Sequence, residues 1–393
     1  MQYHQTNQAM NIPAEFDDIR PYNPDELQGI CEELIADPDF RKAIESVMPG
    51  VPVEALAAQL KQCKTSLDIQ KTFFYELLHQ IIRQHSDGFE LDASQLTDKT
   101  CNYTFISNHR DIVLDPGFLS VGLLDNGFPN TVEIAIGDNL LIYPWIKKLV
   151  RINKSFIVQR ALSMRQMLEA SARLSRYIHF AVTEKGENVW IAQREGRAKD
   201  SNDRTQDSVL KMLVLGGTGD VIDRLKELNI VPLALSYEYD PCDYLKATEM
   251  QLKRDVEGYK KSQADDLLNM QTGIFGYKGH VHFHAAKCIS NELEAFRGLP
   301  KTEVFAKVSH LIDLHIHRNY RLYPGNYVAC DLLDGTDTFA SHYTADDELR
   351  FETYLQKKLD MIDIPNKDEA FLRERMLVMY ANPVINHQKA VEE

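Results

Sequence analysis

Three things are scarce in this chain of 393 residues: closely spaced cysteines, long apolar runs and positive charge. The six cysteines lie far apart without a C-x-x-C pair, which argues against a disulfide framework or zinc ribbon and indicates reduced thiols in a cytosolic chain. No apolar run approaches the ~20 residues of a membrane span, and the first 16 residues do not resemble a signal peptide. With 58 acidic and 44 basic side chains, a general nucleic-acid binder is not expected.

The net charge of -14 is unevenly distributed along the chain. Residues 1–100 carry 17 acidic and 8 basic side chains, whereas residues 147–176 carry 8 basic side chains and one acidic side chain. Most such clusters are solvated faces, but this one also suits the attraction of a phosphate-bearing substrate or a phospholipid headgroup. The stretch YPWIKK at 143–148 adds aromatic and basic residues of the kind that a helix presents to a lipid interface, with ordinary core as the alternative for Trp145.

The pattern of apolar residues predicts an α/β fold with a three-layer sheet, helices on both faces, and a helical unit before it. Residues 24–94 show helical spacing, so we expect an N-terminal helical domain at 1–95, with the first 20 residues as an arm. In residues 96–393, short apolar runs alternate with amphipathic stretches, which favours a largely parallel sheet. The expected strands are YTFIS, TVEIAI, KSFIV, NVWIA, IVPLALSY and KGHVHFH, and one long helix is expected from Asp243 to about Met270.

The first candidate site is FISNHRDIVLDPGF at 105–118, where a strand ends at Ser107 and a turn follows. Ligands and catalytic groups gather at the carboxyl ends of strands in such folds, so His109 is well placed. Asp111 and Asp115 are both close enough in sequence to orient its ring and make it a general base. The alternative is a capping histidine beside two acidic residues of a helix start.

Two further segments carry polar groups at strand ends. In the stretch 134–160 a polar turn contains Asn139, and the second strand ends at Arg160, whose guanidinium suits an anionic group. The loop after NVWIA contains Glu195, Gly196 and Arg197, where the glycine allows close approach of a ligand. A mobile surface loop is the alternative there.

Taken in order, four segments resemble the conserved blocks of the glycerolipid acyltransferase superfamily: NHRDIVLDP, GDNLLIYPWIKKLVRINKSFIVQR, REGRAKD and IVPLALSYE. The resemblance covers residues 102–240. The GDNL turn and the SYE ending are similar to the glycerol-3-phosphate and dihydroxyacetone-phosphate acyltransferase branch, and Leu-Asp-Pro at 114–116 is similar to the lysophosphatidate branch.

The resemblance implies acyl transfer from a thioester, acyl-CoA or acyl-carrier protein, to a hydroxyl of a glycerol-phosphate-type acceptor in phospholipid synthesis. It implies that His109 is the general base and that an aspartate holds it. The spacing to Asp115 is one residue longer than in the family, and we favour Asp115 with a local bulge, keeping Asp111 as the alternate. No cofactor or metal is implied. The implied substrate-binding residues are Arg110, Asn139, Arg160, Glu195, Gly196 and Arg197.

The spaced cysteines and the lack of a signal peptide predict a cytoplasmic protein, and peripheral contact at the inner face of the membrane is a further expectation. A protein that keeps the fold but only binds lipid or acyl chains is the alternative function. Two other features carry little weight: the glycine loop GGTGD at 216–220 lacks a full dinucleotide pattern, and the alternating His280, His282 and His284 lack a further ligand that would complete a metal site.

Overall fold

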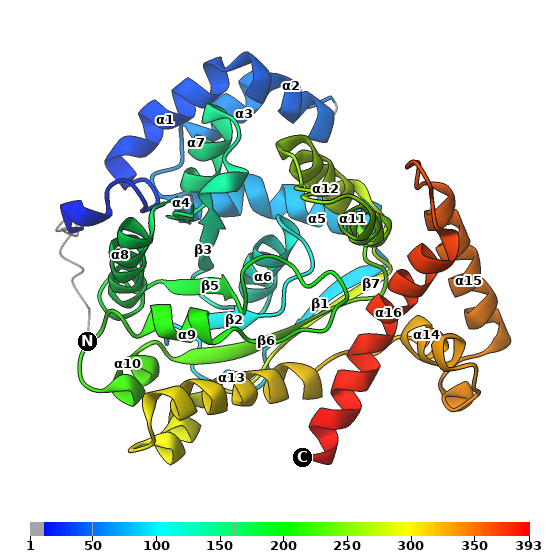
Figure 1. The fold of residues 1–393 in the computed structure, drawn as a ribbon. Helices are drawn as coiled ribbons and strands as arrows, with labels where there is room; N and C mark the ends of the chain where they lie inside the picture. Colours follow the sequence, from blue (N-terminus) through cyan, green and yellow to red (C-terminus); the bar gives the residue numbers. More distant parts are fainter. Residues whose placement is uncertain (1–11, 49, 161) are drawn as a thin grey trace.

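The computed structural model describes residues 12–48, 50–160 and 162–393, which fold around a seven-stranded mixed sheet (Figure 1). In β6, β2, β5, β3 and β4 neighbouring strands are parallel, whereas β7 is antiparallel to β6 and β1 is parallel to β7. In spatial order the strands are β1 (Gly88–Asp92), β7 (His280–Ala285), β6 (Ile230–Tyr237), β2 (Thr104–Ser107), β5 (Asn188–Ala192), β3 (Val132–Gly137) and β4 (Ser155–Val158).

Helices cover both faces of the sheet, so the predicted α/β class is confirmed. One face is covered by α5 (Tyr75–His85) and α6 (Leu114–Asp125), and the other by α8 (Met164–Thr183), α9 (Asp207–Leu213), α10 (Val221–Glu227) and α13 (Lys301–Arg318). Because both faces are covered, the central strands β2 and β6 are buried at every position, which explains why they read as continuous apolar runs.

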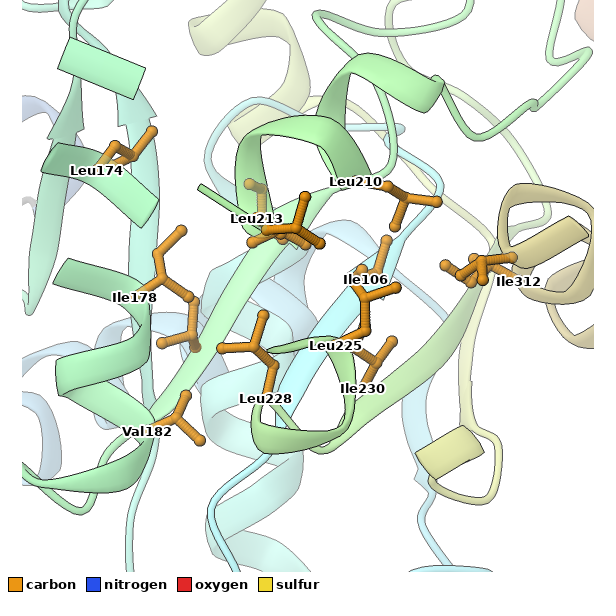
Figure 2. Packing of buried hydrophobic residues seen from close by; sticks show 14 of the residues in the cluster. Ile106, Leu174, Ile178, Val182, Leu210, Leu213, Leu225, Leu228, Ile230 and Ile312 are labelled. Atoms are coloured by element: carbon orange, nitrogen blue, oxygen red, sulfur yellow. The ribbon is translucent and has the colours of Figure 1, made fainter. Parts of the chain in front are cut away.

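The larger of the two apolar layers lies between the sheet and α8, α9, α10 and α13. Figure 2 shows Ile106 of β2 and Ile230 of β6 among leucines and isoleucines of these helices. Phe16 and Ile19 of the N-terminal arm belong to the same cluster, and the N–H of Ile157 in β4 donates to the carbonyl of Ile19 (2.9 Å). The arm therefore contacts the outer edge of β4 through this hydrogen bond.

A helical unit precedes the sheet, as predicted. Its first helices are α1 (Pro24–Ala36), α2 (Pro38–Val47), α3 (Val53–Leu60) and α4 (Ser66–Ile69), and α4 continues through a π-helical turn into α5. They share an apolar cluster with α7 (Pro144–Ile152). The sheet begins before the predicted boundary at 95/96, because β1 at 88–92 already pairs with β7.

The C-terminal helices pack on the end of the molecule near β7. They are α14 (Pro324–Asp334), α15 (Ala345–Asp360) and α16 (Glu369–Glu392), and they bury a common cluster with α11 (Asp243–Asp255). The single helix expected from Asp243 to Met270 is wrong: α11 ends at Asp255, and α12 (Gln263–Phe275) begins after it. Gly258 has φ +72° between them, and Ser262 caps α12 through the N–H of Asp265.

None of the described helices has the length and apolar content that a membrane span requires.

Candidate active site

The turn after β2 brings His109 to the carboxyl edge of the sheet. Before it, the Asn108 amide continues the pairing with β6, since its Nδ2 donates to the Leu235 carbonyl (2.9 Å) and its Oδ1 accepts from the Leu235 N–H (2.8 Å). Asn108 is completely buried. The backbone can therefore leave the sheet after Ser107 while both polar groups of Leu235 stay paired.

His109 is hydrogen-bonded to Asp115, in the first turn of α6. Nδ1 of the ring lies 2.8 Å from Oδ2 of Asp115, and the same oxygen accepts from the backbone N–H groups of Arg110 (2.7 Å) and Asp111 (3.0 Å). Asp115 has no exposed surface. Backbone donors and a helix N-terminus both favour negative charge at this position. A carboxylate here fixes the tautomer with its proton on Nδ1, which makes Nε2 the proton acceptor.

The indole of Trp190 in β5 holds the other side of the imidazole. The two rings meet edge to face with centroids 5.5 Å apart, and the indole Nε1 donates to Oγ of Ser107 (3.0 Å). Nε2 of His109 makes no hydrogen bond to any described residue, and the ring lines a cavity of about 210 Å³. The nitrogen that would accept a proton is thus the one left open.

Asp111, the alternate partner, has no hydrogen bond to the histidine among the described residues. Its Oδ1 accepts from the N–H groups of Val113 (2.8 Å) and Leu114 (2.7 Å), so it caps the start of α6. Burial, and then the charge of Asp115, raise the pKa of Asp111. Its other oxygen lies against α12, where a Cβ on Gly273 would come within 1.9 Å of it. The extra residue in the spacing to Asp115 is accommodated in the turn before α6, rather than in a helical bulge.

Among the charged side chains that line the cavity at His109, basic ones predominate. Gly196 lies in its wall with φ +66°, and the acidic lining residue Asp266 pairs with Lys261 (2.6 Å). A partly enclosed space with excess positive charge beside an open ring nitrogen favours an anionic ligand. The lysine and arginine residues that line it are Arg160, Arg194, Arg197, Lys199 and Lys261.

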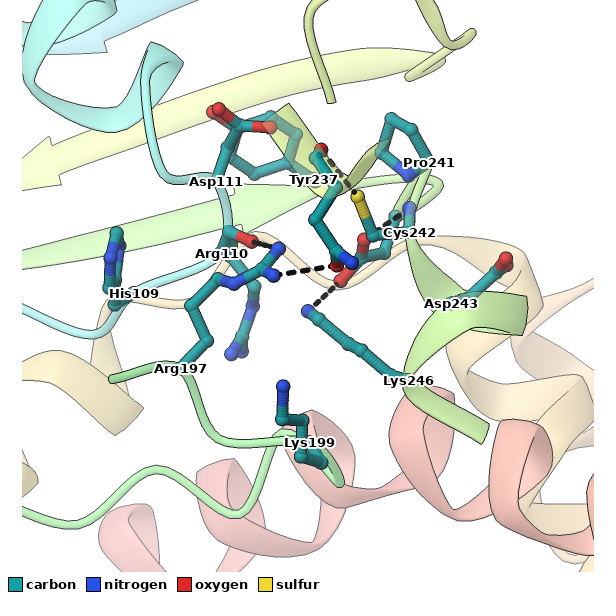
Figure 3. A network of polar contacts seen from close by, with 12 residues as sticks. His109, Arg110, Asp111, Arg197, Lys199, Tyr237, Pro241, Cys242, Asp243 and Lys246 are labelled. Carbon is teal, nitrogen blue, oxygen red and sulfur yellow. Dashed lines mark hydrogen bonds and ion pairs between the residues drawn. The ribbon is translucent and has the colours of Figure 1, made fainter. Parts of the chain in front are cut away.

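Two of these cations, Arg197 and Lys199, bind side chains of α12 and α11. Figure 3 shows both of them on the side of the site opposite Asp111 and Tyr237. Arg197 is buried, and its Nη2 donates to Oδ1 of Asn269 in α12 (2.8 Å). Nζ of Lys199 lies 2.7 Å from a carboxylate oxygen of Glu249 in α11. Burial lowers the pKa of Lys199 to about 8, and the charge of Arg197 acts in the same direction. The positions of both cations depend on segments that the sequence motifs do not include.

The side chain of Arg110 is buried, although its backbone carbonyl accepts a hydrogen bond from Arg197 (3.5 Å). Its guanidinium makes a two-pronged pair with Asp203 (3.0 and 2.6 Å), and the hydroxyl of Tyr320 also donates to Asp203 (2.6 Å). Arg110 is not among the residues that line the cavity. Its charge neutralises a buried carboxylate, and its contact with a substrate stays a prediction.

The remaining predicted substrate-binding residues lie at the cavity or beside it. Asn139, Arg160, Gly196 and Arg197 line it directly. Glu195 is exposed, lies 3.6 Å from the Arg160 guanidinium and lines a neighbouring cavity instead. Their roles with substrate stay predictions.

The neighbouring cavity, of about 270 Å³, lies on the α8 side of the sheet and has a largely apolar wall. It shares Gly137, Arg160 and Arg194 with the cavity at His109, so the two adjoin at the ends of β3, β4 and β5. Nε of Arg194 is buried without a partner among the described residues. The apolar lining includes Ile157, Leu174, Ile191, Val209 and Met212.

Half of the basic cluster at 147–176 contacts the N-terminal part of the chain, and Arg160 is its member at the His109 cavity. The uneven charge distribution thus reflects complementary contacts within the chain more than a patch for a ligand. Trp145 packs near Phe40 of α2, with ring centroids 6.0 Å apart, so the core alternative holds for it. The contacts are Lys148 with Glu33, Arg151 with the carbonyls of Asp17 and Arg20, Arg173 with Asp18, and Arg176 with Glu15.

The glycine loop at 216–220 and the histidines of β7 make contacts with other parts of the chain. At Gly217 in the glycine loop a Cβ would lie 2.5 Å from the His179 ring, so this part of the loop packs closely against α8. Asp87, Glu238 and His280 each bring one ligand-type atom within 4.8 Å of the others. However, Glu238 already accepts from the N–H of His280 (2.9 Å), and Asp87 accepts from the hydroxyl of Tyr277 (2.5 Å).

No protein family matches this chain, and no curated protein matches it either. Among solved structures, its fold is similar to that of the 1-acyl-sn-glycerophosphate (LPA) acyltransferase PlsC from Thermotoga maritima. The TM-score is 0.37 and the sequence identity 10%, over 74% of this chain and 96% of that chain. A likeness this distant carries no functional argument, so function has to be inferred from the geometry of this chain's own residues.

Proposed function

We propose that this protein is an acyltransferase that moves an acyl group from a thioester, acyl-CoA or acyl-carrier protein, to a hydroxyl of a glycerol-phosphate-type acceptor. One observation carries the proposal: Asp115 occupies Nδ1 of a nearly buried His109, and Nε2 is open to a cavity with basic walls. The resemblance of the four sequence segments to glycerolipid acyltransferases points in the same direction.

In the proposed reaction His109 is the general base. Nε2 takes the proton of the acceptor hydroxyl while that oxygen attacks the thioester carbonyl, and Asp115 stabilises the resulting imidazolium. The tetrahedral intermediate then breaks its carbon–sulfur bond, and the leaving thiolate takes the proton from Nε2. No acyl-enzyme forms, because both substrates react directly with one another. Positioning of the two substrates provides much of the rate enhancement.

The phosphate of the acceptor would be bound by the cations of the cavity. Arg197 is prepositioned by Asn269, so little conformational entropy is lost when it binds an anion. Arg160 and Arg194 lie where the two cavities adjoin. In this arrangement Asn139 and Gly196 contact the acceptor, whereas Glu195 acts by orienting Arg160.

The acyl chain of the donor would enter the apolar cavity beneath α8. A chain in that cavity leaves its thioester at the strand ends, next to Arg160 and Arg194, whose charges suit the phosphates of a coenzyme A or phosphopantetheine group. Because an acceptor of this class yields a lipid, peripheral contact with the inner face of the membrane is part of the same proposal.

The test is acceptor-dependent release of thiol from the donor. Acyl-CoA of several chain lengths and acyl-carrier protein are incubated with a panel of glycerol 3-phosphate, dihydroxyacetone phosphate and lysophosphatidate, and glycerol serves as the control that lacks phosphate. The proposal expects thiol release that depends on a phosphate-bearing acceptor. Binding of acyl-CoA without release, over the whole panel, would instead support a non-catalytic lipid-binding protein.

A further inference from the structure

Among the described residues, the second carboxylate oxygen of Asp115 has one hydrogen-bond partner. Oδ2 accepts from the imidazole and from two backbone N–H groups, whereas Oδ1 accepts from the hydroxyl of Tyr237 (2.9 Å). Tyr237 is the last residue of β6, and 122 positions separate it from Asp115 in the sequence. The hydroxyl of Tyr237 therefore links the His109–Asp115 pair to the end of β6.

The position of Tyr237 is fixed by the sheet itself. The Asn108 amide, directly before His109, bonds both backbone groups of Leu235, two residues ahead of Tyr237. The phenol ring is buried and packs near Phe283 of β7, with centroids 6.1 Å apart. Burial, and then the charge of Asp115, raise the pKa of Tyr237 well above its usual value, so the hydroxyl remains a donor.

The three donors to Oδ2 restrain one end of the carboxylate against rotation about the Cβ–Cγ bond. A donor on Oδ1 restrains the other end and so sets the plane in which Oδ2 meets Nδ1 of the imidazole. We propose that Tyr237 is a positioning residue that acts on His109 through Asp115. The inference rests on the proposed function, since it assigns a role within the same site.

The test is Tyr237→Phe, which removes one oxygen atom from a ring that otherwise stays packed. We expect kcat to fall about 10- to 100-fold, in the range seen when a partner that orients a catalytic group is removed. KM for both substrates should change by less than about twofold, because the hydroxyl donates to Asp115 and Tyr237 does not line the cavity. An Asp115 that can pivot stabilises the imidazolium less, so the acid limb of the kcat/KM profile moves to lower pH.

Tyr239→Phe is the matched control, since Tyr239 is also buried and its hydroxyl makes no hydrogen bond to the described residues. It should leave kcat and the pH profile unchanged, with both variants melting within a few degrees of the native protein.

A second readout does not need turnover: NMR exchange of the Nδ1 proton of His109 with solvent, which we expect to be at least several-fold faster in Tyr237→Phe. If the native protein has no acyltransferase activity but the proton still exchanges faster, the proposed function fails and the positioning role stands. Native kcat, native acid limb and native proton exchange in Tyr237→Phe would overturn the inference.

Discussion

Two histidines of this protein look alike until their surroundings are compared. The side chains of His109 and His284 are both 13% exposed, and each places Nδ1 near an aspartate, at 2.8 Å from Asp115 and 3.2 Å from Asp92. Yet Asp115 has no exposed side-chain surface, whereas Asp92 is 34% exposed. Nε2 of His284 lies 3.1 Å from the Gln95 amide nitrogen, whereas that of His109 is open to a cavity.

The difference shows that a histidine beside a carboxylate does not define an active site. His179 makes the same point, because Glu227 occupies its Nδ1 (2.7 Å) and the Leu213 carbonyl its Nε2 (2.9 Å). A general base needs an orienting partner on one nitrogen and room for a reacting group at the other. Among these three pairs, His109 meets both conditions.

The largest effect should separate the two histidines directly. His109→Ala removes the proton acceptor, so acceptor-dependent thiol release should fall at least about 10³-fold, within the range that general base catalysis contributes. His284→Ala should keep it within about twofold. Circular dichroism of both variants checks the fold. Comparable losses of thiol release in His109→Ala and His284→Ala would contradict the distinction between the two histidines.

The second-largest effect should be a difference in kcat between variants of Asp115 and of Asp92. Asp115→Asn presents an amide that can bind either tautomer of the ring, so kcat should fall about 10²- to 10³-fold. The matched change Asp92→Asn leaves a solvated pair and should alter kcat by less than about twofold. The measurement is steady-state kcat for each variant at the pH optimum. A native kcat in Asp115→Asn would show that the buried carboxylate does not orient His109.

The turn that carries His109 packs against α12, where the Asp111 carboxylate lies over Gly273. In Gly273→Ala the new Cβ would clash with the Asp111 carboxylate, so the free energy of unfolding should fall by about 1–3 kcal/mol. Gly29→Ala in α1 meets nothing within 4 Å and should stabilise the protein by about 0.5–1 kcal/mol. Urea unfolding measures both. Equal shifts in the two variants would contradict the packing of α12 against this turn.

The smallest effect concerns the charge around His109. The pKa of Lys199 is lowered to about 8 by burial, with Arg197 and Lys246 lowering it further and Glu249 opposing them. Lys199 is therefore charged below that pH and loses its charge above it. KM for a phosphate-bearing acceptor should rise several-fold from pH 7 to pH 9. In Lys199→Arg the charge persists, so a step of the same size there would exclude Lys199 as its source.

Sequence patterns predicted the strands of the central sheet because strands covered on both faces must be apolar throughout. The same logic fails for β1, whose GFELD sequence mixes polar and apolar residues beside the half-covered β7. It also fails at Gly258, since a glycine within a polar stretch fits either a helix or a break.

The residue pattern left both Asp111 and Asp115 open as partners of His109, and the family resemblance favoured Asp115, which is the one hydrogen-bonded to it. The groups that hold the site come from distant segments, such as Asn269 on Arg197 and Asp203 on Arg110. Arg110 and Arg197 are indistinguishable as residues in a motif. The fold separates them, because Arg110 pairs with the buried Asp203 whereas Arg197 lines the cavity at His109.

A double-mutant cycle on His109 and Asp115 tests the central claim most directly, namely that the two work as one unit. The measured quantity is kcat/KM for acceptor-dependent thiol release in His109→Ala, Asp115→Asn and the double variant. Because Asp115 acts only through the imidazole, the double variant should be no slower than His109→Ala alone. Losses that multiply in the double variant would contradict the account, since Asp115 would then act on the reaction without His109.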